Sequence, residues 1–333
     1  MRAPSTSTLR RTAAGAAAIS IAVALTSCSN GDSASDFPSE TVEIMVPAAA
    51  GGGWDSTARA MQKVAQDEDL TGESVEVFNV EGGGGATGLA QLQKDDGNPH
   101  HLMMTGLVMI GALQLADSEV ALDDTTPIAT LTAEAEAFVV PADSGYQTIN
   151  DVVEAYQQDP SSVTFGGGSA GGSDQLVAAV LLKSAGADAA QMKYIGYSGG
   201  GEAIAGILSG DVEVGVSGIS EFTSQIESGD MRLLAVSTAD PIEVAGEPAP
   251  TLKDAGYDVD FANWRAIVAA PGLSDEQQQA VTDLVDELHG TQAWEDTLAQ
   301  NGWTDFYKTG DDAQQFIDDE TQRVADLYEE LGL

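Results

Sequence analysis

The sequence predicts an α/β protein with two lobes, each built on a mostly parallel sheet with helices on its faces. Strand-like apolar runs alternate with helical stretches from residue 42 to residue 115, and again from about residue 148 to residue 236. This alternation is typical of parallel strands covered by helices. The chain crosses between the two series near 134–141 and again near 262–268, which indicates two lobes joined by a hinge.

The elements follow from apolar runs, glycine loops and helix caps. The first series comprises strand 42–46, helix 57–66, strand 74–80, a helix to about residue 94, strand 101–105, helix 107–115 and an extended stretch over 128–140. The second comprises helix 149–158, strand 163–165, helix 174–183, strand 193–197, a helix to residue 208, strand 212–216, helix 221–227 and strand 233–236. We expect helix 149–158 to end before Pro160, since the residue before a proline disfavours helical geometry.

The last part of the chain is expected to return to the first lobe. A strand at 264–269 is followed by helices, of which the first begins with Ser274 as its N-cap because Glu276 and Gln277 lie in the first turn. Further helices are expected to residue 298 and from about residue 312 to residue 331. The first lobe is therefore assigned to 39–137 plus 266–333, and the second to 138–265.

Three glycine-rich loops lie at the predicted junctions between a strand and a helix, at 51–53, 82–88 and 166–173. Glycine allows the backbone to approach a ligand closely. A helix that begins there directs free N–H groups and its positive dipole end toward an anion. No Lys or Arg occurs between Lys94 and Lys183. We therefore expect the main chain to bind one anionic small molecule.

The candidate ligand-binding residues belong to these loops or to neighbouring strand ends. They are Gly52, Gly53, Trp54, Asp55, Thr57, Gly84, Gly85, Ala86, Thr105, Ser169, Gly171, Ser173, Tyr197 and Gly200. Three of these roles have structural alternatives. Asp55 could cap the first helix or accept a ligand hydroxyl, and Trp54 could form the wall of the pocket or anchor the loop. Ser169 and Ser173 could donate to a ligand carboxylate or cap the following helix.

Charge and residue spacing exclude several other functions. The formal net charge of −40 over 333 residues argues against nucleic-acid binding, which needs a basic surface. His100-His101 has no metal-ligand spacing with other His or Cys residues, so no metal and no cofactor is expected. The pattern Gly83-x-Gly85-x-x-Gly88 fits a dinucleotide loop, but the acidic residue expected about 20 positions later is missing.

The N-terminus is typical of an exported lipoprotein. Arg2, Arg10 and Arg11 precede an alanine-rich apolar stretch, so residues 1–27 are expected to be a signal peptide. Leu25-Thr-Ser-Cys28 matches a bacterial lipobox, and Cys28 is the only cysteine of the chain. We expect lipidation at Cys28, a flexible tether over 28–38, and a protein anchored to the outer face of the cytoplasmic membrane.

Six motifs in order resemble the substrate-binding proteins of tripartite tricarboxylate transporters, also called the TctC or Bug family. They are Gly51-Gly-Gly-Trp-Asp55, Asn79-Val-Glu-Gly-Gly-Gly-Gly-Ala86, Phe165-Gly-Gly-Gly-Ser-Ala-Gly-Gly-Ser173, Tyr197-Ser-Gly-Gly-Gly-Glu-Ala203, Gly210-Asp-Val-Glu213 and Asn263-Trp-Arg265. The resemblance covers about residues 40–333. It implies a Venus-flytrap fold of the periplasmic-binding-protein type that closes on a small organic carboxylate.

The resemblance also implies a function without catalysis. The expected protein is a monomer that captures a citrate-like di- or tricarboxylate and delivers it to integral membrane subunits of a transporter. Two alternatives remain open at this point. One is a secreted hydrolase that uses Ser169, for which only His289 follows as a candidate base. The other is a lipoprotein that binds a carboxylate and passes the signal to a receptor.

Overall fold

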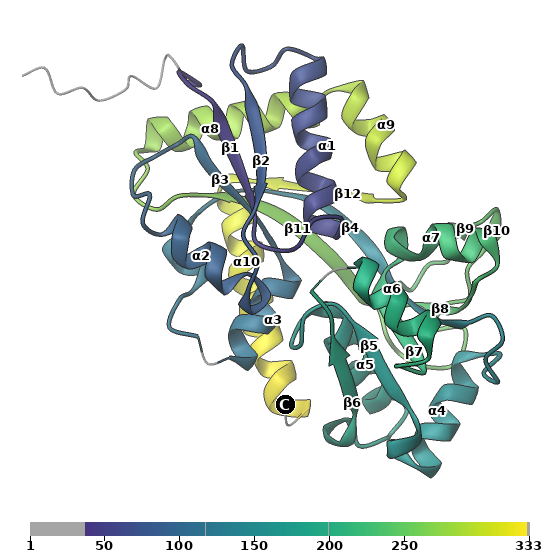
Figure 1. Cartoon of the computed structure of the whole chain (residues 1–333). Coiled ribbons are helices and arrows are strands. Elements are labelled where there is room, and N and C mark those ends of the chain that lie inside the picture. The colour runs from purple at the N-terminus through teal and green to yellow at the C-terminus, as the bar shows by residue number, and fades with distance from the viewer. Residues whose placement is uncertain (1–36, 117, 199, 332–333) are drawn as a thin grey trace, which may run out of the picture. The chain divides into compact units, whose positions relative to one another are not determined.

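The computed structural model describes residues 37–116, 118–198 and 200–331. All of them lie in the compact unit Ala34–Leu333. The predicted signal peptide, lipobox and Cys28 lie outside the described residues. Ten strands form one sheet with the order β2-β1-β3-β11-β4-β7-β5-β6, and β12 and β8 both pair with β4 (Figure 1).

One part of the sheet is parallel and comes from the first series. β1 (Val42–Val46) lies between β2 (Val75–Asn79) and β3 (His101–Gly106), and both pairs are parallel. Each of these strands leads into a helix: α1 (Gly53–Asp67), α2 (Ala86–Leu92) and α3 (Leu107–Leu115). The α/β alternation predicted from the apolar runs is confirmed here.

The other end of the sheet is parallel in the same way. β5 (Thr164–Gly167) lies between β6 (Lys193–Gly196) and β7 (Val214–Gly218). Four helices accompany these strands: α4 (Ile149–Gln158), α5 (Ser173–Ser184), α6 (Gly200–Ser209) and α7 (Ile219–Ser228). Helix α4 begins with a capping box, in which Thr148 and Asp151 satisfy each other's backbone N–H groups.

The two parallel parts are joined by antiparallel strands. β4 (Thr126–Pro141) pairs near its start with β11 (Ala262–Ala269) and β12 (Thr304–Thr309). Near its end β4 pairs with β7 and with β8 (Met231–Val236), also antiparallel. β4 therefore runs through both parts of the sheet, and β11 crosses back to β3, as the two predicted crossings require.

Helices at the end of the chain complete the fold. They are α8 (Asp275–His289), α9 (Gln292–Asn301) and α10 (Gly310–Leu331), while β9 (Glu243–Val244) and β10 (Glu247–Pro248) form a small hairpin. Ser274 caps α8 through a capping box with Gln277, which confirms the predicted N-cap. Among the described residues, no helix has both the length and the apolar character needed to cross a membrane.

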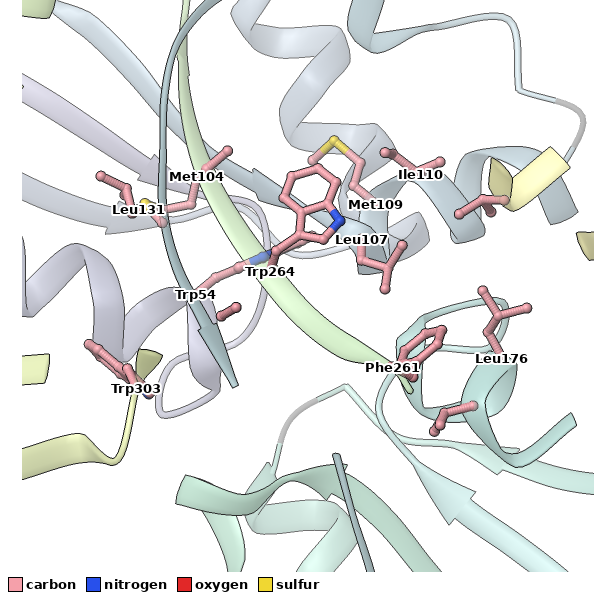
Figure 2. Close-up of a cluster of buried hydrophobic side chains, with 14 of the residues drawn as sticks. Trp54, Met104, Leu107, Met109, Ile110, Leu131, Leu176, Phe261, Trp264 and Trp303 are labelled. Carbon is pink, nitrogen blue, oxygen red and sulfur yellow. The ribbon is translucent and has the colours of Figure 1, made fainter. Parts of the chain in front are cut away.

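The core contains polar side chains beside its apolar ones. Every residue of β4 from Pro127 to Val140 is buried, and this stretch includes Glu134 and Glu136. Figure 2 shows the apolar cluster where α1 and α3 meet β3 and β11, with Trp54 among Met104, Leu107 and Met109. The buried glutamates lie on the strand that both parts of the sheet share, which places charge beside the site described next.

Candidate functional site

The glycine loops converge on one cavity of about 500 Å³. Gly52, Gly53 and Trp54 line it from the loop after β1, and Gly82, Gly83 and Gly84 from the loop after β2. The loops after β5 and β6 contribute Gly168, Ser169, Ala170, Gly196, Tyr197, Ser198 and Gly200. Ligands of α/β proteins bind outside the carboxyl ends of parallel strands, and this cavity lies at the carboxyl ends of four.

The first loop brings the start of α1 against the cavity. Gly52 is the N-cap of α1, and no side chain caps the first N–H groups of this helix. A Cβ atom on Gly53 would lie 2.3 Å from Nη2 of Arg265, so only glycine allows this close approach. The Gly53 N–H donates to Oε1 of Glu221 over 3.1 Å. The N-terminus of α1 therefore already holds a carboxylate of the protein itself.

The second loop depends on glycine at four consecutive positions. Gly82, Gly83, Gly84 and Gly85 have φ angles of 131°, 60°, 60° and 108°, all in the region that favours glycine. A Cβ atom on Gly84 would also lie 2.1 Å from Cβ of Ala112. The glycine run thus lets the main chain itself form this side of the cavity.

The third loop is organised by Asp174, the second residue of α5. Its Oδ2 accepts the Gly168 N–H over 2.7 Å, and its Oδ1 accepts the Ser173 hydroxyl over 2.8 Å. The Tyr194 hydroxyl donates to the Gly168 carbonyl over 2.9 Å. Asp174 also lines the cavity, so it both shapes the loop and presents a carboxyl group to the cavity.

One buried ion pair lies beneath the first loop. Arg265 of β11 donates to Glu134 of β4, and the two side chains are 2% and 0% exposed. The Ser220 hydroxyl, at the start of α7, donates to the other Glu134 oxygen over 2.7 Å. The pair thereby connects β11, β4 and α7, which the sequence places far apart. Arg265 also lines the cavity.

Glu136, Asp174 and Glu221 have no cationic partner among the residues that the structure describes. Both carboxylate oxygens of Glu136 lack a hydrogen-bond partner in the described part of the chain, and the residue is 0% exposed. Burial, and then repulsion from Asp174, raises the pKa of Glu136 well above its usual range. Burial also raises the pKa of Asp174. For Glu221, burial and repulsion from Asp174 raise the pKa to about 7. These carboxyl groups repel one another and resist ionisation.

Asp55 faces its own loop. It is 4% exposed, and it accepts hydrogen bonds from the Gly51 N–H, Arg59 and Asn79 over 2.9, 2.9 and 3.0 Å. Burial alone would raise the pKa of Asp55, but these hydrogen bonds and the charge of Arg59 outweigh it and hold the pKa below its usual value. The geometry makes Asp55 the residue that fixes the loop between β1 and α1.

We therefore expect Asp55→Ala to lower the free energy of unfolding of the unliganded protein by about 1–3 kcal/mol, because it removes three hydrogen bonds to a buried carboxylate. Chemical denaturation measures this change. Asp67→Ala is the matched control, since Asp67 lies on the same helix in an exposed pair with Lys63 and should change stability by less than about 0.5 kcal/mol. Full stability in Asp55→Ala together with lost ligand binding would instead place Asp55 in direct contact with the ligand.

Half of the candidate residues predicted from sequence line the cavity. They are Gly52, Gly53, Trp54, Gly84, Ser169, Tyr197 and Gly200. Trp54 is only 7% exposed, so its indole both forms wall and anchors the loop in the core. The other candidates lie behind this lining and are Asp55, Thr57, Gly85, Ala86, Thr105, Gly171 and Ser173.

Several residues behind the lining support it through contacts of their own. The Thr57 hydroxyl donates to the Gly53 carbonyl over 2.9 Å, and the Thr105 hydroxyl contacts Sδ of Met109 at 3.3 Å. Gly171 accepts a hydrogen bond from the Tyr328 hydroxyl. Gly85 is the N-cap of α2 and Ala86 its first residue. Ser173 donates to Asp174 and does not cap α5, whose N-cap is Gly172.

The cavity is also lined by polar residues that were not among the candidates from sequence. These include Asp174, Ser217, Glu221, Asn263 and Arg265. Asn263 and Arg265 stand in the motif Asn263-Trp-Arg265, so the motif was a usable signal. Glu221 and Asp174 had no comparable signal, because single acidic residues near helix starts are usually solvated or act in capping.

The geometry does not support the alternative of a hydrolase that uses Ser169. His289 pairs with Asp305 at 3.1 Å and stacks on Tyr307, and no histidine lines the cavity among the residues that the structure describes. Within the same residues, no group of three or more His, Cys, Asp or Glu side chains is arranged to hold a metal ion.

Comparison with known proteins identifies the family. Residues 58–333 match the model described as "Tripartite tricarboxylate transporter family receptor". Protein BugT of Bordetella pertussis is 25% identical over 306 residues, covering 90% of this chain and 92% of BugT.

Solved structures have the same fold. MatC from Rhodopseudomonas palustris with bound malate has a TM-score of 0.74 at 19% identity, and the match covers 87% of this chain and 99% of MatC. The R. palustris protein Rpa4515 with adipate has a TM-score of 0.76 at 18% identity, and the match covers 89% of this chain and 99% of Rpa4515. The fold is thus the predicted two-lobed fold of periplasmic binding proteins, and the family consists of solute-binding proteins rather than enzymes. The chain belongs to the receptors of the tripartite tricarboxylate transporter family.

Proposed function

We propose that this receptor captures a small organic carboxylate in the cavity at the glycine loops and delivers it to the membrane subunits of a tripartite transporter. The observation that carries the proposal is the convergence of loops from four parallel strand ends on one cavity of about 500 Å³, a size suited to a small ligand. Malate and adipate in two structures of the same fold support a carboxylate as the ligand class.

In this proposal, residues 39–137 with 266–333 and residues 138–265 are the two lobes. A ligand between them contacts the loops after β1 and β2 on one side and the loops after β5 and β6 on the other. Closure follows because the ligand reaches both sets of loops only when the lobes are together, so it favours the closed state. Lipidation at Cys28 keeps the receptor at the membrane that holds its transporter, and a citrate-like molecule is the proposed ligand.

Thermal unfolding of the purified protein against a ligand panel tests the binding class. The panel comprises citrate, tricarballylate, malate, succinate, adipate, glutamate, aspartate and a neutral sugar. A carboxylate at a thousand times its Kd should add about 4 kcal/mol to stability and raise Tm by several degrees. Ala170→Trp should abolish the shift, because Ala170 is exposed and lines the cavity.

Ala190→Trp is the matched control for this experiment. Ala190 is also exposed but lies outside the cavity lining, so this variant should keep the full shift. A shift with the sugar and with no carboxylate would contradict the proposed ligand class. If the purified protein binds a carboxylate but a strain that lacks its gene still takes up that carboxylate, the sensor would be favoured over the transport receptor.

A further inference from the structure

The N-terminus of α1 is occupied by a carboxylate from a distant part of the chain. Glu221 of α7 accepts the Gly53 N–H over 3.1 Å, although 168 residues separate the two. The Ser217 hydroxyl donates to the other Glu221 oxygen over 3.2 Å. α1 has 15 residues and no side-chain cap, so its first N–H groups favour an anion at this position. Glu221 therefore lies where a ligand carboxylate would be stabilised.

Two further polar atoms lie beside this wall of the cavity. Oδ1 of Asn263 and Nη1 of Arg265 have no hydrogen-bond partner in the part of the chain that the structure describes. The two residues are only 7% and 2% exposed, and both line the same cavity as Glu221. Buried polar groups are normally paired, so these two atoms mark a polar and incompletely satisfied region beside the cavity.

The charges around Glu221 make its ionised form costly. Asp174 on α5, Glu136 and Glu134 on β4, and Tyr194 on β6 all lie near it. Arg265 on β11 is the one nearby cation among the described residues, and it is engaged by Glu134. These surroundings raise the pKa of Glu221 to about 7, through burial first and repulsion from Asp174 second. A ligand anion placed beside ionised Glu221 would meet the same repulsion.

We propose that Glu221 holds the carboxylate position of the unliganded cavity, and that an anionic ligand takes this position only when Glu221 gains a proton. Above about pH 7, where Glu221 is ionised in the unliganded protein, one proton from solvent enters with each ligand. The neutral Glu221 then donates its O–H to an oxygen of the ligand carboxylate, which in turn accepts the Gly53 N–H. This inference rests on the proposed function, because it assumes that the ligand is a carboxylate. Glu221 is thus a specificity-determining residue that selects anions through its own protonation.

Calorimetric titration of malate and adipate between pH 6.5 and 8.5 at constant ionic strength tests the wild-type protein. The affinity should change little below about pH 7 and should fall about tenfold per pH unit above it, because ionised Glu221 must then be neutralised. Titration at pH 8 in buffers of different ionisation enthalpy should show uptake of about one proton for each malate bound.

Two variants test whether Glu221 causes this pH dependence. Glu221→Gln keeps the size and the acceptor oxygen but cannot ionise, so its affinity for malate should be independent of pH and equal to the low-pH affinity of the wild type. At pH 8 this is about a tenfold gain. Glu227→Gln is the matched control on the same helix, where Glu227 is exposed, and it should follow the wild-type profile.

The outcomes separate this inference from the proposed function. Affinity for malate or adipate that does not change with pH, or a Glu221→Gln variant that still follows pH, would overturn the role of Glu221 and leave the carboxylate receptor intact. Affinity for malate or adipate that rises with pH would also overturn it, because ionised Glu221 would then not oppose the ligand. Failure of every carboxylate of the panel to bind at any pH would overturn the proposed function itself.

Discussion

Replacing Arg265 by methionine is expected to lower the free energy of unfolding by about 3–5 kcal/mol, as the loss of one partner of a buried ion pair does. Methionine keeps most of the apolar stem, so the effect reports the guanidinium. Glu134, which is 0% exposed, would keep the Ser220 hydroxyl but lose its only cationic partner in the described part of the chain. The loss should be smaller at low pH, where Glu134 can take up a proton. Urea denaturation at two pH values measures both effects.

Two controls distinguish this interpretation from a general loss of packing. The double variant Arg265→Met with Glu134→Gln should recover part of the stability, because no charge then remains unpaired. Lys183→Met removes one partner of an exposed pair with Glu330 and should cost less than about 1 kcal/mol. A single Arg265→Met variant as stable as Lys183→Met would show that the pair beneath the first loop contributes nothing to the fold.

The fold could be predicted because its signals are local. The apolar runs and the glycine-rich junctions in the first 236 residues predicted the alternating elements, and the positions of α4, α5 and α8 agree within two residues. β12 was missed. Its sequence Thr304-Asp-Phe-Tyr-Lys-Thr309 is short and largely polar, and it forms a strand because β4 offers it an edge with which to pair. Such pairing depends on the tertiary structure and leaves little trace in the local pattern.

The site was predictable only as far as the main chain determines it. Glycine runs between a strand and a helix predicted the loops, because positive φ angles and close approach require glycine. The buried acidic residues beside the cavity were not predicted. Glu134 and Glu136 alternate with alanine in β4, a pattern typical of a strand with one face in solvent, yet both faces of this strand are buried. Arg265, which pairs with Glu134, lies 131 positions away.

The carboxyl groups at and beside the cavity lead to a second large effect, on the stability of the unliganded protein. We expect its free energy of unfolding to fall by about 3 kcal/mol between about pH 4.5 and pH 8 through Glu221 alone. Its pKa rises from 4.5 to about 7 on folding, and each pKa unit corresponds to about 1.4 kcal/mol. Over this range the native state binds more protons than the unfolded state, so stability decreases as pH rises. Glu136 and Asp174, whose pKa values are also raised, act in the same direction.

Groups with lowered pKa values change the free energy of unfolding in the opposite direction and in a different pH range. Hydrogen bonds from Arg59 and the Gly51 N–H outweigh the burial of Asp55, so its contribution is present above its ordinary value of 3.8 and is lost as pH falls below it. The acidic surface of a chain with net charge −40 repels itself more strongly as pH rises, which adds to the slope from the buried acids. A comparison of variants at the same pH removes this shared surface contribution.

Chemical denaturation of the wild type, Glu221→Gln and Glu227→Gln at several pH values tests the expectation. Glu221→Gln should match the wild type near pH 4.5 and exceed its stability by about 3 kcal/mol near pH 8, since glutamine has no proton to lose. Glu227→Gln should keep the wild-type slope, because its side chain is exposed on the same helix. Equal slopes for all three proteins would show that Glu221 ionises freely in the folded state, and the repulsion attributed to Asp174 would then be absent.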